Sequence, residues 1–198
     1  AFGLLIDEDI ALTNIEEIVK KASINNIFVR LDMENHRVTQ PTIDIVYKMQ
    51  SRGYYNIGTV LQGRLFRTTD DITKIVDNLA GLTDIRICKG IYIEDENIAY
   101  RDYNKIRENY IDLVKKALRK GAYVGIASHD EYLIDISTNL NFLNKELSSK
   151  RKYILGHSLG GLAISQYLND FDGGIYLSCN LSPLDSLIIS QTKYIFSL

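Results

Sequence analysis

The sequence has little of what several protein classes require. Its 23 Lys and Arg residues are balanced by 25 Asp and Glu, for a formal net charge of -2, so no basic surface predicts binding to nucleic acid. The apolar runs are far shorter than a bilayer span, and no signal-peptide pattern opens the chain. With 45% hydrophobic and 24% charged residues, the composition is typical of a soluble globular protein.

Cysteine is also scarce. Cys88 and Cys179 both fall in strand-like runs, which predicts that they are buried and reduced. We therefore expect a cytoplasmic protein, with peripheral attachment to the inner face of the membrane as a further option. The chain begins at Ala1 without an initiator methionine, which suggests a fragment. Neither a second domain nor a low-complexity linker is visible, so residues 1–198 are predicted to form a single domain.

Strand-like runs alternate along the chain with helical patterns. The predicted strands are residues 27–32, 56–62, 84–90, 123–129, 152–155 and 174–179. The predicted helices are residues 14–24, 41–53, 69–80, 104–120, 131–147 and 161–168, the first beginning at a capping box that starts with Thr13. Because alternating strands and short-looped helices imply right-handed crossovers, the fold class is α/β with a parallel sheet.

Polar residues cluster where the predicted strands end: Asp32, Gln62, Arg86 and the pair Ser128-His129. If the sheet curls into a barrel, these side chains converge on one mouth. Arg86 stays charged and is poor filling for a core, so it requires an anionic or electron-rich partner. Two plainer roles stay open, namely helix caps for the Asp and Ser, and a structural carboxylate partner for Arg86. Together the set favours a site for a large, polar, phosphorylated cofactor.

Residues 3–147 resemble the proline dehydrogenase family, the flavin-dependent (βα)₈-barrel enzymes of proline catabolism. Four segments carry the resemblance in order: Phe28–Glu34 (Asp-x-Glu), Val60–Gln62 (Gln motif), Ile85–Tyr92 (Arg-x-x-Lys-Gly-x-Tyr) and Ala127–Asp130 (Ala-Ser-His). The third is the most specific. The sequence departs from the family pattern where Gly63-Arg64-Leu65 replaces Ala-Tyr, where Ile91 replaces Ala and where Ser128 replaces Thr.

The resemblance implies oxidation of L-proline to Δ¹-pyrroline-5-carboxylate, with FAD accepting the hydride and a quinone reoxidising it. The resemblance also implies roles for seven residues. Gln62 and Arg86 would contact the isoalloxazine ring, and Lys89, Ser128 and His129 would bind the ribityl, pyrophosphate or adenosine part of FAD. Asp32 would join the polar network beside the substrate, and Tyr92 would line the proline pocket. A nearby guanidinium would stabilise the negative charge that reduction builds on the ring.

Two cationic motifs of the family have no counterpart here. The family's first strand brings a Lys to the substrate carboxylate, and its last helix brings an Arg-Arg-x-x-Glu motif, whereas no Arg follows Arg151. Losing these charge-assisted contacts would cost several kcal/mol of substrate binding. We therefore expect flavin binding to survive better than turnover, and a catalytically silent α/β fold is one alternative.

Residues 150–183 are similar to the nucleophile elbow of α/β-hydrolases. Gly156–Gly160 reads G-x-S-x-G between a predicted strand and a predicted helix, which places Ser158 at a helix N-terminus. A serine hydrolase or esterase using Ser158 is therefore the second functional hypothesis. The triad order of that fold requires a later His, and none follows His157.

The predicted architecture is thus a partial TIM-like barrel of about six strands, with an open doubly wound sheet as the alternative. Six strands are too few for the usual closure, so sheet edges should be covered by self-association into a homo-oligomer. We expect no metal site. A less favoured alternative is a site formed by Asp32, Glu34 and His36, which would lie on one side of an extended segment.

Overall fold

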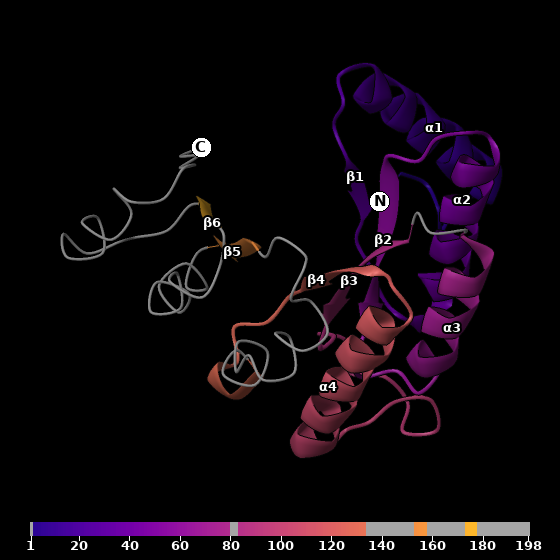
Figure 1. The fold of residues 1–198 in the computed structure, drawn as a ribbon. Coiled ribbons are helices and arrows are strands. Elements are labelled where there is room, and N and C mark those ends of the chain that lie inside the picture. Colours follow the sequence, from indigo (N-terminus) through magenta and orange to yellow (C-terminus); the bar gives the residue numbers. More distant parts are fainter. Residues whose placement is uncertain (1, 80–82, 134–152, 158–172, 178–198) are drawn as a thin grey trace. The chain divides into compact units, whose positions relative to one another are not determined.

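The computed structural model of this chain describes residues 2–79, 83–133, 153–157 and 173–177 (Figure 1). The chain divides into two compact units, Ala1–Ala127 and Ser128–Leu198, and each is described by itself. That all 198 residues form one domain remains a prediction. No helix in the described part of the chain is long and apolar enough to cross a membrane.

A parallel four-stranded sheet forms the centre of the first unit. Its strands are β1 (Val29–Leu31), β2 (Ile57–Gln62), β3 (Asp84–Cys88) and β4 (Tyr123–Ile126), arranged in the order β1-β2-β3-β4. All six residues of β2 are buried, as expected of a central strand in a parallel sheet. The α/β class and the first four predicted strands are confirmed. The fourth is shorter than predicted, because it ends at Ile126 and leaves Ser128 and His129 beyond it.

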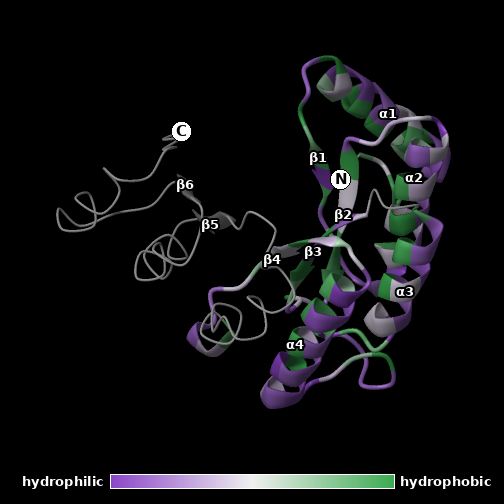
Figure 2. Ribbon diagram, in the orientation of Figure 1, coloured by the Kyte–Doolittle hydropathy of each residue, from purple (hydrophilic) through white to green (hydrophobic). Residues whose placement is uncertain are grey.

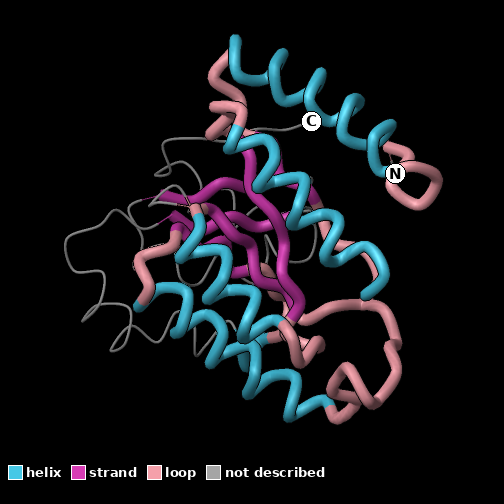
Figure 3. The backbone as a smooth tube through the Cα atoms, turned by 90° about the vertical axis from the view of Figure 1, so that its right-hand side faces the viewer, coloured by secondary structure: helices cyan, strands magenta, loops and turns pink. Residues whose placement is uncertain are grey.

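Helices α2 (Thr39–Ser51), α3 (Thr68–Asn78) and α4 (Tyr103–Arg119) lie together along one face of this sheet (Figures 1 and 3). A short 3₁₀ helix, η1 (His36–Val38), precedes α2. Apolar residues of the strands and of the helix sides that face them form the core (Figure 2). The fully buried side chains of this core include Met49, Ile57, Leu61, Ile72, Ile75, Ile85, Ile87, Ile106, Tyr110 and Leu113. These three helices match the predicted ones to within a few residues.

Helix α1 (Glu8–Ile24) begins six residues earlier than predicted. Asp7 is its N-cap, because the Asp7 carboxylate accepts hydrogen bonds from the backbone N–H groups of Asp9 and Ile10. Thr13, predicted to start the helix, lies inside it and donates its hydroxyl to the carbonyl of Asp9 at 2.8 Å. The predicted capping box was therefore wrong, since a second capping residue lies upstream.

In the second unit, β5 (Tyr153–His157) pairs in parallel with β6 (Gly173–Leu177), which confirms the last two predicted strands. Gly156 and His157 belong to β5, whereas the sequence predicted them in a tight turn. Ser158 and Cys179 lie outside the described residues, as does most of the helix predicted over residues 131–147.

Candidate functional site

The strand register assigns side chains to the face of the sheet opposite α2, α3 and α4, which we call the inner face. Arg30 pairs with Gly58, Val60 pairs with Arg86, and Arg86 pairs with Gly125. Because paired residues of parallel strands point to the same side and alternate residues point to opposite sides, the inner face follows from these pairs. It carries Arg30 of β1 and Asp32 just after it, Gly58, Val60 and Gln62 of β2, Asp84, Arg86 and Cys88 of β3, and Tyr123 and Gly125 of β4.

Arg86 was predicted at the end of a strand, but it lies on the inner face in the middle of β3. Its Nη2 donates to Asp32 Oδ1 at 2.7 Å, and the two side chains are 37% and 72% exposed. Its Nε is buried and has no hydrogen-bond partner among the described residues. The stem of Arg86 crosses Gly125, where an added Cβ would lie 3.3 Å from Arg86 Cγ. The structural carboxylate partner is therefore present, yet it leaves a buried donor available to a ligand.

Gln62 ends β2, where it pairs with Cys88 two residues beyond Arg86, and it is 2% exposed. Its amide nitrogen donates to the carbonyl oxygens of Glu34 at 2.7 Å and Met33 at 3.4 Å, which fixes the orientation of the amide. Its Oε1 is buried and lacks a partner within the described part of the chain. Gly90, with φ +95°, lies against this oxygen, and a Cβ there would be 2.7 Å from it. Only a glycine accommodates both this backbone conformation and this approach.

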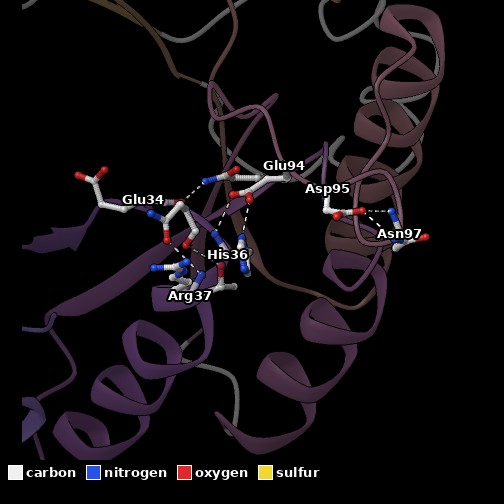
Figure 4. Close-up of polar contacts among 9 residues, drawn as sticks. Glu34, His36, Arg37, Glu94, Asp95 and Asn97 are labelled. Atoms are coloured by element: carbon white, nitrogen blue, oxygen red, sulfur yellow. Dashed lines mark hydrogen bonds and ion pairs between the residues drawn. The ribbon is translucent and has the colours of Figure 1, made fainter.

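The loops that follow β1 and β3 are joined to each other above Gln62. The Tyr92 hydroxyl donates to the Glu34 carboxylate, and this hydrogen bond is the main cause that raises the pKa of Tyr92. Glu94, 6% exposed, accepts from the backbone N–H of His36 at 2.8 Å and contacts His36 Nδ1 at 2.5 Å (Figure 4). Glu94 could not be singled out from the sequence, because nothing in the local pattern distinguishes it from the acidic residues that follow it.

The other three predicted ligands of the cofactor are Lys89, Ser128 and His129. Lys89 donates its Nζ to the Tyr103 hydroxyl at 3.0 Å and lies 4.8 Å from that ring's centroid, so it contacts the first residue of α4. Ser128 and His129 belong to the second unit, where Ser128 Oγ accepts from the backbone N–H of Asp130 at 3.1 Å and His129 is exposed. The structure thus brings together Asp32, Gln62, Arg86 and Tyr92.

The described residues hold no group of three His, Cys, Asp or Glu side chains arranged to bind a metal ion. His36 instead pairs with Glu94, so the alternative metal site at Asp32, Glu34 and His36 is not formed.

The site combines a buried unpartnered donor, Arg86 Nε, with a buried unpartnered acceptor, Gln62 Oε1, on adjacent strands. Buried oxygens of Asn56, Thr59 and Thr83 also lack partners among the described residues, so what distinguishes Arg86 Nε and Gln62 Oε1 is that they lie on adjacent strands of the inner face. An unpaired buried polar atom costs about 1–3 kcal/mol, so a ligand that pairs with both atoms would recover part of that cost. A flat heteroaromatic ring whose edge both donates and accepts fits this pair. The Arg86 guanidinium would stabilise negative charge that develops on such a ring.

Comparison with known proteins gives consistent results. A family model described as proline dehydrogenase matches residues 4–170. Proline dehydrogenase 2 of Bacillus subtilis (strain 168) is 37% identical over 141 residues, covering 71% of this chain and 45% of that protein. Proline dehydrogenase of Deinococcus radiodurans is 33% identical over 154 residues, covering 77% of this chain and 44% of that protein. The chain thus spans less than half the length of the curated relatives it matches.

A crystal structure of proline utilization A (PutA) from Bdellovibrio bacteriovorus, inactivated by N-propargylglycine, has a similar fold. The TM-score is 0.68 over 92% of this chain and 21% of that one, at 13% identity. It agrees with a partial TIM-like barrel. The family match also runs through Gly156–Gly161, so the predicted α/β-hydrolase elbow has no support, and Ser158 lies outside the described residues.

Proposed function

The chain belongs to the proline dehydrogenase family, and on this premise we propose that it takes part in the FAD-dependent oxidation of L-proline to Δ¹-pyrroline-5-carboxylate. The observation that carries the proposal is the pair formed by Arg86 Nε and Gln62 Oε1, both buried and both without a partner among the described residues. A bound flavin would supply two-electron hydride acceptance at this site.

Arg86 and Gln62 are the residues proposed to hold the flavin ring. The Arg86 guanidinium can stabilise the negative charge that reduction places on the ring. Asp32 uses one guanidinium nitrogen and so orients Arg86 without occupying its buried Nε. The carbonyl oxygens of Met33 and Glu34 orient the Gln62 amide so that its oxygen remains available.

For the rest of the site we propose the roles that the family resemblance implies. Tyr92 would line the proline pocket, and its bond to Glu34 would hold the hydroxyl in place. Asp32 would join the substrate-side network. Lys89, Ser128 and His129 would contact the ribityl, pyrophosphate or adenosine part of FAD, for which Lys89 would have to exchange its contact with Tyr103.

The proposed partners are L-proline as substrate, a quinone as electron acceptor and a second copy of the chain. Self-association is supported by the sheet edges, because within the described residues of the first unit β1 pairs only with β2 and β4 only with β3. Unpaired edges of a parallel sheet are normally covered. Sedimentation equilibrium of the whole chain tests this, and a stable monomer at micromolar concentration would contradict it.

The proposed function is tested by supplying FAD to the purified chain and recording its visible absorbance, followed by anaerobic addition of L-proline. We expect flavin binding in the parent and weaker binding in Arg86→Met. Lys120→Met, at the surface ion pair with Asp77, is the matched control and should bind as the parent does. A chain that stays colourless refutes the proposal. Binding without bleaching would show a flavin site on this chain that does not by itself oxidise L-proline.

A further inference from the structure

Two ion pairs are stacked on the inner face, one level apart. Arg30 Nη2 contacts Asp84 Oδ1 at 2.6 Å, and Arg86 Nη2 contacts Asp32 Oδ1 at 2.7 Å. Both pairs join β1 to β3 across β2, and their polarity is reversed: β1 carries the cation of the lower pair, whereas β3 carries the cation of the upper pair. Each charge therefore has an opposite charge across the sheet and another two residues along its own strand.

The lower pair, Arg30 and Asp84, is held by more contacts than the upper one. Arg30 Nη1 also donates to the Thr59 carbonyl at 3.3 Å, and its guanidinium carbon lies 4.9 Å from the Phe28 ring centroid. The two charged side chains are 25% and 19% exposed. Gly58 makes room for this arrangement, because a Cβ there would lie 2.9 Å from Phe28 Cζ and 2.3 Å from the Asp84 carbonyl oxygen.

The contribution of the Arg30–Asp84 pair to stability does not by itself explain why two charged residues occupy the inner face. The inner positions of parallel barrels are normally filled by branched apolar side chains. Replacing a buried ion pair by apolar residues of similar volume is often neutral or stabilising, because desolvation offsets much of the attraction between the charges. The lower pair lies two residues before Arg86 on β3, and Arg86 Nε is a buried donor without a partner among the described residues.

We propose that Arg30 and Asp84 are positioning residues for the site at Arg86, where they set the local electrostatic potential and keep the Asp32–Arg86 pair in register. This inference rests on the proposed function for one of its two measurements. Residues two apart on a strand are separated by roughly 6.6 Å, which is within the range of unscreened interaction at moderate ionic strength. Removing one charge of the lower pair therefore changes the potential at Arg86 with a sign that depends on which charge is removed.

Cys88 provides a measurement that requires no cofactor. It lies on the inner face two residues after Arg86. Burial raises the pKa of the Cys88 thiol, the charge of Arg86 lowers it and that of Asp32 raises it, and Tyr110 of α4 is its buried titratable neighbour. The rate at which this thiol is alkylated thus reports the charge balance of the inner face. Mass spectrometry of the Cys88 peptide separates its signal from that of Cys179.

The experiment compares Arg30→Met and Asp84→Asn in the full chain at pH 8.5 and low salt. Arg30→Met should make the midpoint potential of bound FAD more negative, and Asp84→Asn should make it more positive. We expect about a tenfold change in the ratio of reduced to oxidised flavin, which is about 30 mV for a two-electron couple. In the cofactor-free chain, Cys88 alkylation should slow about twofold in Arg30→Met and accelerate about twofold in Asp84→Asn.

Lys120→Met, which removes the cation of the Lys120–Asp77 pair on the helix side, is the control and should change neither measurement. A merely structural lower pair would move both single variants in the same direction, and that result overturns the proposal. If a single variant does not fold, the exchanged pair Arg30→Asp/Asp84→Arg decides, since it retains an ion pair. It should accelerate Cys88 alkylation, and an unchanged rate overturns the proposal. A chain that binds no FAD would refute the proposed function, while the Cys88 rates would still test the lower pair.

Discussion

Removing the Glu94 carboxylate should loosen the two loops above Gln62. Glu94 accepts from the backbone N–H of His36 at 2.8 Å and contacts the His36 ring at 2.5 Å, and its side chain is 5% exposed. Glu94→Ala removes both contacts and leaves the His36 N–H without its acceptor. Hydrogen bonds to charged groups contribute about 1.5–3 kcal/mol each, so we expect a loss of about 3 kcal/mol, because the half-exposed His36 ring can bind water instead.

The measurement is thermal unfolding followed by calorimetry. A change of 1 kcal/mol shifts the Tm of a chain of this size by about 2–4 °C, so Glu94→Ala should lower Tm by about 6–12 °C. Glu94→Gln keeps one carbonyl oxygen for the His36 backbone N–H and should lose about half as much. Glu96, two residues on and exposed, is the matched control, and Glu96→Ala should change stability by less than about 0.5 kcal/mol.

A local measurement separates this contact from general destabilisation. Amide hydrogen exchange at His36 should accelerate in Glu94→Ala, while Glu94→Gln should retain part of the protection. If the chain oxidises L-proline as proposed, the KM for proline should rise more than kcat falls, because the same loops carry Glu34 and Tyr92. Equal Tm values for Glu94→Ala and Glu96→Ala would refute the reasoning, and so would unchanged exchange at His36.

Three other predictions follow from single contacts. Gly90→Ala should lower the free energy of unfolding by about 1–3 kcal/mol and weaken FAD binding, because its Cβ would lie 2.7 Å from Gln62 Oε1. The control is Gly53→Ala, which has φ +88° and no atom within 4 Å of the added Cβ and so introduces backbone strain alone. Equal denaturation midpoints for the two variants would contradict this prediction. Burial raises the pKa of the Cys88 thiol, so its alkylation rate should still be rising at a pH where the rate of an ordinary cysteine has levelled off; a pH-rate profile that levels off as early as that of free cysteine would be inconsistent with the structure. Tyr110→Phe should lower the free energy of unfolding, measured in urea, by about 1 kcal/mol. The Tyr110 hydroxyl donates to the Ile87 carbonyl at 3.0 Å, and that oxygen keeps a second donor, the backbone N–H of Ala127. A loss above about 3 kcal/mol would contradict this prediction.

The alternation of strands and helices could be predicted because it depends on local periodicity. A strand such as Ile57–Gln62 is recognised from β-branched residues, and a helix such as Tyr103–Arg119 from its polar and apolar faces, without knowledge of what covers them. The start of α1 could not be predicted, because both Asp7 and Thr13 are good N-cap residues and the sequence alone does not choose between them.

The sequence by itself determined the parallel strands and so placed Asp32 and Gln62 at strand ends and Arg86 within the strand between Asp84 and Cys88. Only the tertiary structure decided their partners. Arg86 and Asp32 are 54 positions apart, as are Asp84 and Arg30, while His36 and Glu94 are 58 apart. Such contacts depend on strand order and register, which arise when separate βα units pack together. No window of local sequence contains that information.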